Sequence, residues 1–386
     1  MARIILAGYM VRHPVAGNLL AFFQYLLGLH RLGHELFYIE ESGWPGSCYN
    51  PTKNIQSDDP SYGLRTVRAL ATEYGLRIPF CFINRESGSV DGAERQDINR
   101  KLQRADLLLN IGGVCWLEEF RLCRRRALID MDPLFTQIGR FGADGFSEHQ
   151  VYFSYGTNIG RPGCGIPVDR TDWIASVPPV VPELWSAIEP DHETQGQLAE
   201  RDALTTIANW KAYGSVRYRG EHYGQKDEEF LRIIDLPRHT SQKLELAVSG
   251  IGPRLAEQFQ SAGWLVRSTT ELSLSVGAYR RYIAGSRGEF SVAKNAYVKT
   301  NSGWFSDRSV CYLASGKPVL VQNTGIGDCL PTGEGLLTFR DIPEALSGIE
   351  SINASYQKHC QAAKALAVKY FAADVVLPRL LKVALN

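Results

Sequence analysis

The segment SGWFSDRSVCYLASGKPVLVQNTGIGDCLP contains a helix start whose residue types suit the binding of an anion. Ser306 or Asp307 fits the N-cap position, and Arg308 and Ser309 then fall in the first turn. The first turn of a helix offers N–H groups and a positive dipole end, and an arginine adds a bidentate contact to phosphate. The same residues also fit an ordinary capped helix with an exposed arginine.

Further basic and small residues follow predicted strands in the second half of the chain. Lys211, Ser215 and Arg217 lie in NWKAYGSVRYRGEHYGQK, directly after the predicted strand LTTIANW. A loop of small residues with basic side chains at a strand end suits a phosphate, although a solvated loop is the alternative. Ser249 and Lys294 follow two further predicted strands, LELAVSG and GEFSVAK, and are candidates for the same reason.

Candidate acid–base residues lie in the first half. His13 follows the first predicted strand in YMVRHPVAGN, and an imidazole that titrates near neutral pH suits a general base. Asp130 and Asp132 end another predicted strand in LIDMDP, where either could orient His13 or act as the base. Each has a structural alternative, because His13 also precedes a proline-started helix and Asp132 also fits a turn before Pro133.

Three polar residues of the first half are candidates for contact with a second ligand. Asn18 lies five residues after His13. Asn158 and Arg161 lie in FSYGTNIGRPGCGIP, a glycine-rich stretch at the end of another predicted strand. Long irregular stretches at strand ends often shape binding sites, so we expect these residues to face a ligand.

These candidates need a scaffold that brings distant strand ends together. Residues 1–180 alternate strand and helix patterns, and their strands, such as ADLLLNIGG, are nearly continuous apolar runs. This pattern predicts a parallel sheet covered by helices on both faces. A proline-rich stretch, ASVPPVVPELWSAIEPDH, suits a connector, and the alternation restarts over residues 195–365. We therefore predict two Rossmann-like α/β domains facing a cleft, with ligands bound beyond the carboxyl ends of the strands.

Composition sets limits on partners and location. The 386 residues are 44% hydrophobic and 22% charged, enough for two packed cores. The net charge is +1, from 42 basic and 41 acidic residues, so we expect no nucleic-acid partner and no attraction to an anionic membrane. The apolar stretch 19–29 is too short to span a bilayer and the N-terminus reads as a strand, so we expect no transmembrane segment.

Cysteine and histidine spacing argue against a metal centre. The eight cysteines form no CxxC pair and the eight histidines form no HExxH pattern. Buried, reduced thiols in a cytoplasmic protein are the simple interpretation, and we expect no metal site and no resident cofactor. A homodimer is compatible with these observations.

Taken together, this layout resembles the GT-B glycosyltransferases. The local match is YLASGKPVLVQNTGIG, which is similar to the donor-site stretch of that family at Ala314, Gly316, Pro318, Val319 and Thr324–Gly325. The resemblance implies that the second domain binds a nucleoside diphosphate (NDP) sugar, that the first offers the acceptor, and that the final helix, 366–386, packs back on the first domain.

The resemblance also assigns roles to residues. It implies that the turn at Thr324, Gly325 and Gly327 approaches the sugar, where glycines let backbone amides come close. It implies a metal-independent transfer to a hydroxyl of a small-molecule acceptor, inverting and with His13 as base. Retaining members often carry a Glu-x7-Glu pair, but Gly303 and Cys311 occupy those positions here, which indicates an atypical branch. The alternatives are a UDP-sugar 2-epimerase of the same fold and a non-catalytic sugar- or nucleotide-binding protein.

Overall fold

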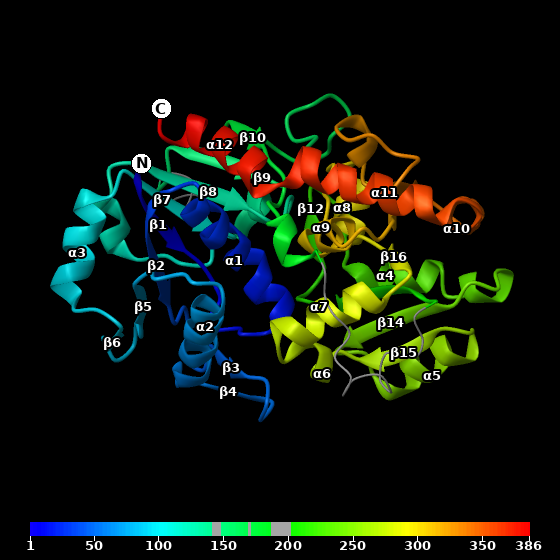
Figure 1. Ribbon diagram of the computed structural model, residues 1–386, viewed down its shortest axis with the longest axis horizontal. Coiled ribbons are helices and arrows are strands. Elements are labelled where there is room, and N and C mark those ends of the chain that lie inside the picture. The colour runs from blue at the N-terminus through cyan, green and yellow to red at the C-terminus, as the bar shows by residue number, and fades with distance from the viewer. Residues whose placement is uncertain (141–147, 169–170, 187–201) are drawn as a thin grey trace.

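The computed structural model describes residues 1–140, 148–168, 171–186 and 202–386, and it contains two parallel sheets that lie side by side (Figure 1). In the first sheet every neighbouring pair of strands is parallel except β5 and β6. The strand order of the first sheet is β10 (Trp173–Ala175), β9 (Val151–Ser154), β8 (Arg126–Asp130), β7 (Leu107–Ile111), β1 (Arg3–Ala7), β2 (Glu35–Glu41), β5 (Phe80–Ile83) and β6 (Val90–Asp91).

The second sheet is parallel throughout. Its strand order is β15 (Leu265–Ser268), β14 (Leu244–Ser249), β11 (Leu204–Asn209), β16 (Gly288–Ser291), β17 (Val319–Gln322) and β18 (Leu336–Phe339). In chain order this is 3-2-1-4-5-6, the arrangement of a dinucleotide-type Rossmann sheet. The strand order reverses between β11 and β16, which makes that junction the expected ligand position in this domain.

Helices cover both sheets, as the strand–helix alternation of the sequence predicts. Those associated with the first sheet are α1 (Ala16–Arg31), α2 (Ser61–Glu73) and α3 (Arg95–Arg104). Those that follow in the second half are α4 (Lys226–Arg232), α5 (Pro253–Ser261), α6 (Thr270–Ser273), α7 (Val276–Gly285), α8 (Asn295–Lys299), α9 (Asp307–Ala314), α10 (Ile342–Ala354), α11 (Tyr356–Leu366) and α12 (Ala373–Ala384).

Two short antiparallel hairpins were not expected from the sequence. They are β3 (Cys48–Asn50) with β4 (Ile55–Ser57), and β12 (Val216–Tyr218) with β13 (Glu221–Tyr223). Each strand has only three residues, which is too short for apolar alternation to be recognised. The first hairpin lines a cavity between the two domains, which is called the principal cavity below.

The C-terminal helix returns to the first domain, as the GT-B resemblance implies. Helix α12 packs on α1, and α11 leads to it across the second domain, so that the two chain ends lie near one another (Figure 1). Gly28 of α1 permits this close approach, since a Cβ there would lie 2.6 Å from Leu377 and 2.7 Å from Ala373. Arg125 Nε also donates to the carbonyl oxygen of Ala384 at 2.8 Å.

The apolar helix α1 is buried against the connector between the domains. Gln24, the polar residue in its apolar run, is buried, and its side-chain oxygen accepts from Val181 N at 3.1 Å and Trp185 Nε1 at 3.2 Å. Among the described residues, no helix is both long and apolar enough to cross a membrane. Residues 187–192, the end of the predicted proline-rich connector, lie outside the described residues.

Candidate active site

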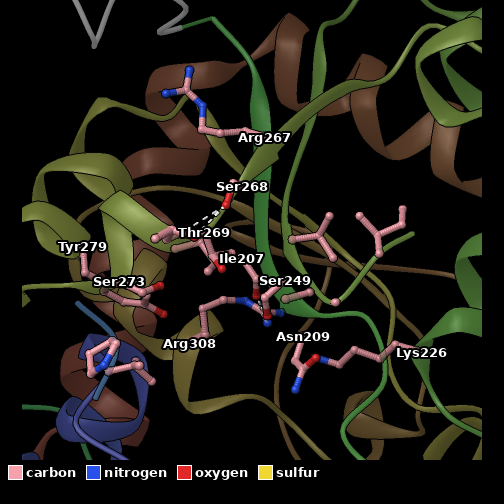
Figure 2. Close-up of a pocket in the computed structure, with 18 of the residues that line it drawn as sticks. Ile207, Asn209, Lys226, Ser249, Arg267, Ser268, Thr269, Ser273, Tyr279 and Arg308 are labelled. Atoms are coloured by element: carbon pink, nitrogen blue, oxygen red, sulfur yellow. Dashed lines mark hydrogen bonds between the residues drawn. The ribbon is translucent and has the colours of Figure 1, made fainter. Parts of the chain in front are cut away.

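A cavity of about 900 Å³ lies between the two domains, at the carboxyl ends of β11, β14 and β15 (Figure 2). Its second-domain wall also includes the starts of α4, α6 and α9, and its first-domain wall comes from the loop after β1 and from the β3–β4 hairpin. This volume is within the range of small-molecule sites, and the position beside the β11–β16 junction is the one that the topology favours.

Arg308 lies in the cavity wall and links helix α9 to both strands of that junction. Its Nε donates to Glu289 Oε1 at 2.6 Å, one Nη donates to the carbonyl oxygen of Ile207 at 2.7 Å, and the other donates to Ser291 Oγ at 2.6 Å. Burial opposes the charge, but the neighbouring carboxylate of Glu289 raises the pKa of Arg308 above its ordinary value. The alternative of an exposed arginine is therefore wrong, while its contact with phosphate stays a prediction.

Lys226, the first residue of α4, is another cation of the cavity wall, which also includes Arg267. Its ammonium lies 6.0 Å from the ring centroid of Trp304, and the side chain is half-buried. Burial, together with the positive charges of Arg308 and Lys294, lowers the pKa of Lys226 to about 7. Lys226 is the last residue of the basic stretch NWKAYGSVRYRGEHYGQK and was not among the predicted site residues, although its position directly at a helix start is a signal that could have identified it.

Other residues predicted to bind the donor divide into two groups. Ser249, Ser306 and Asp307 line the cavity, and Ser306 caps α9 by accepting from Arg308 N at 3.3 Å. Ser309 and Thr324 are buried behind the wall, and Thr324 Oγ1 donates to the carbonyl oxygen of Trp304 at 2.7 Å. The helix start identified in the sequence thus faces the cavity. The turn at Thr324, Gly325 and Gly327 does not line the cavity.

Lys211, Ser215 and Arg217 do not line the cavity. The first turn of α4 is acidic, and two of these side chains contact it. Lys211 pairs with Asp227 at 3.4 Å, and Ser215 Oγ donates to Glu228 Oε1 at 3.2 Å. Arg217 lies on the β12–β13 hairpin. The acidic residues that follow Lys226 therefore explain why the loop turns away from the cavity.

Lys294 and Asp132, predicted to serve donor binding and catalysis, instead pair with each other across the domain boundary. Their ion pair measures 2.8 Å, and the hydroxyl groups of Tyr213 and Tyr297 also donate to the Asp132 carboxylate. Burial tends to raise the pKa of Asp132, but Lys294 and the two hydroxyl groups hold it below its ordinary value. Neither residue lines the cavity, so the structure supports a domain contact at this position.

Asp130 is buried beneath the same loop and has a structural set of partners. It accepts hydrogen bonds from Thr136 Oγ1 at 2.5 Å, Ser154 Oγ at 2.7 Å, Gln137 Nε2 at 2.9 Å and Asp132 N at 2.8 Å. Burial raises the pKa of Asp130. These bonds fix the loop after β8 and include none to His13, so the predicted orienting role has no support in the geometry.

His13 lies in the first-domain wall, where the sequence predicted it at the mouth of the cleft. Its ring stacks between Tyr9, at 5.9 Å between centroids, and Tyr49 of the β3–β4 hairpin, at 5.4 Å. Among the described residues, no hydrogen bond to either ring nitrogen of His13 is found. Burial lowers the pKa of His13, so the imidazole is neutral near pH 7 and able to accept a proton.

The loop that carries His13 is fixed by a buried carboxylate. Glu40 accepts hydrogen bonds from Val11 N at 2.8 Å, Arg12 N at 2.7 Å and the Tyr38 hydroxyl at 2.6 Å. Asn18 donates from Nδ2 to the carbonyl oxygens of Tyr9 at 2.6 Å and His13 at 2.8 Å. Asn18 therefore holds the loop through its amide group, in place of the acceptor contact predicted from the sequence.

The glycine-rich stretch that contains Asn158 and Arg161 connects the domains and does not line the cavity. Asn158 is buried and donates from Nδ2 to the carbonyl oxygens of Gly325 at 3.0 Å and Asn301 at 3.1 Å. Gly325 has φ of +86°, and a Cβ there would lie 2.5 Å from Asn158 Nδ2. The glycine is therefore required by the domain contact, and its predicted approach to a sugar has no support in this geometry.

A metal centre has no residues to build it in the described part of the chain. No group of three or more His, Cys, Asp or Glu side chains there is placed to hold a metal ion.

Comparison with known proteins identifies the fold. No protein-family model matches the sequence, and no curated protein sequence is similar to it. Among solved structures, an alpha-glucosyltransferase in complex with UDP-glucose and DNA containing an abasic site matches with a TM-score of 0.59 and 9% identity, over 100% of this chain and 99% of that one.

Two further structures are similar over almost their whole lengths. AviGT4, a glycosyltransferase involved in avilamycin A biosynthesis, has a TM-score of 0.53 and 15% identity, with 100% of this chain and 97% of that chain covered. Sucrose-phosphate synthase from Thermosynechococcus elongatus has a TM-score of 0.55 and 10% identity, with 99% and 98% covered.

The expectation that nucleic acid is excluded as a partner was wrong. Several matching alpha-glucosyltransferase structures are complexes with DNA. A net charge near zero does not exclude nucleic acid as a partner, because a local basic surface can bind phosphates even when the charges of the whole chain cancel.

The resemblance inferred from the sequence is confirmed at the level of architecture: two Rossmann-like domains enclose a cavity at the switch point of the second sheet, and a C-terminal helix crosses back to the first. The chain has the GT-B fold of nucleotide-sugar glycosyltransferases.

Proposed function

We propose that this protein transfers a glycosyl group from an NDP-sugar to a hydroxyl group of an acceptor. The observation that carries the proposal is the division of the cavity into two chemically different walls. The second-domain wall holds the start of α9 and three cations, Lys226, Arg308 and Arg267, of which Arg267 pairs with Glu245, and the first-domain wall holds an imidazole, His13. One wall suits an anion and the other suits proton removal.

The diphosphate belongs beside Lys226 and the first turn of α9. Arg308 already has a carboxylate partner, Glu289, whereas the low pKa of Lys226 reflects two cations near it and loss of water. A diphosphate placed there would restore the charged form of Lys226 and accept N–H groups from α9. With protein cations in this place, the leaving diphosphate is stabilised without a metal ion.

The acceptor belongs against the first-domain wall, and its reacting part is uncharged. The described residues of that wall are His13, Val15, Gly17, Tyr49, Pro51, Asn54 and Gln56. With His13 neutral, none of these carries a formal charge. Tyr49 offers an aromatic face, and Asn54 and Gln56 offer amide groups, which suits a neutral, hydroxyl-bearing ring. This holds for the part inside the cavity and leaves room for a larger molecule outside it.

The transfer is a single displacement. The acceptor oxygen attacks the anomeric carbon as the bond to the diphosphate oxygen breaks, and the electron pair leaves on the diphosphate. His13 accepts the hydroxyl proton as the new bond forms, and configuration inverts. An epimerase would need further acid–base groups around the sugar, and Asp307 is the one carboxylate among the described cavity residues.

The proposal is tested by ligand and product analysis. We expect UDP, TDP or GDP to raise the unfolding temperature of the full chain, and the matching NDP-sugar to yield free NDP together with a glycosylated acceptor. The acceptor panel should contain neutral sugars, phenols and DNA containing an HMU base. Release of ManNAc from UDP-GlcNAc without any acceptor would favour the epimerase, and binding of free sugar without nucleotide would contradict both enzymes.

Chelation should leave turnover unchanged. Since Lys226, Arg308 and the α9 start surround the proposed diphosphate position, excess EDTA is expected to change the initial rate by less than about twofold. The measurement is NDP release with and without EDTA in the same buffer. Abolished turnover that Mg²⁺ or Mn²⁺ restores would contradict the proposed role of these cations.

Donor affinity should fall as pH rises above 7. The pKa of Lys226 is about 7 in the free protein. A bound diphosphate raises the pKa of Lys226, so binding is strongest where the lysine is charged. Above the pKa of Lys226 in the free protein, affinity falls by up to about tenfold per pH unit. Calorimetry with UDP-glucose is suitable because its diphosphate has no free terminal phosphate to titrate. Lys226→Met should remove this pH dependence, while Lys211→Met, a lysine outside the cavity, should retain it.

A further inference from the structure

A second cavity, of about 440 Å³, lies at the opposite end of the first sheet. Arg3 begins β1 and Glu35 begins β2, and both line this cavity, so it faces the amino ends of the strands. The principal cavity faces the carboxyl ends. The two cavities are therefore separated by the length of the first sheet, and none of the residues that line one lines the other.

Cations predominate around this second cavity. Five lysine or arginine side chains line it, against two carboxylates, Glu35 and Asp97. The five are Arg3, Arg77, Arg100, Lys101 and Arg104. They come from a strand, from the loop between α2 and β5, and from α3, so they are far apart in sequence and brought together by the fold.

Internal pairing accounts for only part of this charge. Arg3 pairs with Asp106 at 2.7 Å and Arg100 with Asp97 at 3.5 Å. In the described ranges, Arg77 and Arg104 form no ion pair. The carboxyl end of α3 favours a cation such as Arg104, but a helix dipole does not account for Arg77, which lies in a loop.

The floor of the cavity is apolar. Ile5 and Phe37 are paired neighbours on β1 and β2, and they lie buried on the face of the sheet that packs against α3. The Lys101 ammonium lies 5.1 Å from the centroid of the Phe37 ring. A site with a cationic rim over an apolar floor is suited to a ligand that has both a phosphate and an apolar body.

We propose that this cavity is a second anion site, which binds a phosphorylated small molecule or the phosphorylated headgroup of a lipid. Arg77 and Arg104 contact the phosphate, and the floor formed by Ile5 and Phe37 packs against the rest of the ligand. The site does not depend on the proposed glycosyl transfer, because no cavity residue is shared.

Inorganic tripolyphosphate is the first probe, titrated by calorimetry into full-length Lys226→Met protein so that the principal cavity contributes least. We expect Arg77→Gln/Arg104→Gln to weaken binding by about tenfold or more, because each arginine supplies a charge-assisted contact. The matched control is Arg68→Gln/Arg124→Gln, which removes the same charge at exposed positions outside the cavity and should leave binding within about twofold.

Vesicles of phosphatidylglycerol, compared with phosphatidylcholine, form the second arm. Tripolyphosphate binding that only the cavity pair weakens identifies a free phosphorylated ligand. Vesicle binding that only the cavity pair weakens, without tripolyphosphate binding, identifies a headgroup. Absence of both kinds of binding, or equal losses in the cavity pair and the control pair, would overturn the site.

Discussion

His13→Ala is expected to lower kcat by about a hundredfold or more, the usual scale for loss of a general base. The imidazole lies in the first-domain wall, stacks on Tyr9 and Tyr49, and is neutral because burial lowers its pKa. Among the described residues of that wall no other histidine and no carboxylate is present that could replace it. The measurement is steady-state product formation over a range of donor concentrations with saturating acceptor, and KM for the donor should change little.

The pH profile separates loss of a base from loss of packing. A base must be deprotonated, so wild-type kcat should stay level as pH falls past 6.5, the ordinary value for histidine, and decline only at lower pH, because the pKa of His13 is lowered. His13→Gln, which keeps a polar side chain of similar size, should remove that decline along with the rate. His239→Ala, an exposed histidine outside the cavity, is the matched control. Turnover near the wild-type level in His13→Ala would contradict the role.

Arg308→Ala is expected to lower the free energy of unfolding by about 3–5 kcal/mol, the range for breaking a buried ion pair. Glu289 is fully buried, and Arg308 is its ion-pair partner at 2.6 Å. Removing the guanidinium leaves that carboxylate uncompensated and also leaves the carbonyl oxygen of Ile207 without its donor at 2.7 Å. Urea and thermal unfolding of the full chain measure the loss.

Two comparisons assign the cause of this loss. Arg308→Met/Glu289→Gln removes both charges together, and it should be less destabilised than Arg308→Ala because no buried charge is left unpaired. Arg340→Ala breaks an exposed pair with Glu344 at 3.1 Å and should cost less than about 1 kcal/mol. Equal losses of unfolding free energy in Arg308→Ala and Arg340→Ala would contradict the prediction, because the buried Arg308–Glu289 pair would then contribute no more to stability than an exposed pair.

The fold could be predicted because its signals are local. Apolar strands such as β7 and β14, and the glycines and prolines that end helices, depend on short-range preferences. The three-residue strands of the β3–β4 hairpin carry no such signal, so the hairpin and its contribution of Tyr49 to the cavity were not anticipated. The candidate site was partly predicted for the same reason, since His13 lies in the loop between the first strand and the first helix and Ser306 is the N-cap of α9.

The sequence by itself determined two parallel α/β sheets, a helix start with an arginine at the cavity, and a histidine after the first strand. The tertiary structure decided which polar residues are available to a ligand. Lys294 and Asp132 neutralise each other across the domain boundary, Lys211 pairs with Asp227, and Lys226 is left at the cavity with a pKa of about 7. Pairing of charges is a long-range property, since it depends on which distant segments meet in space, and residue spacing along the chain does not encode it.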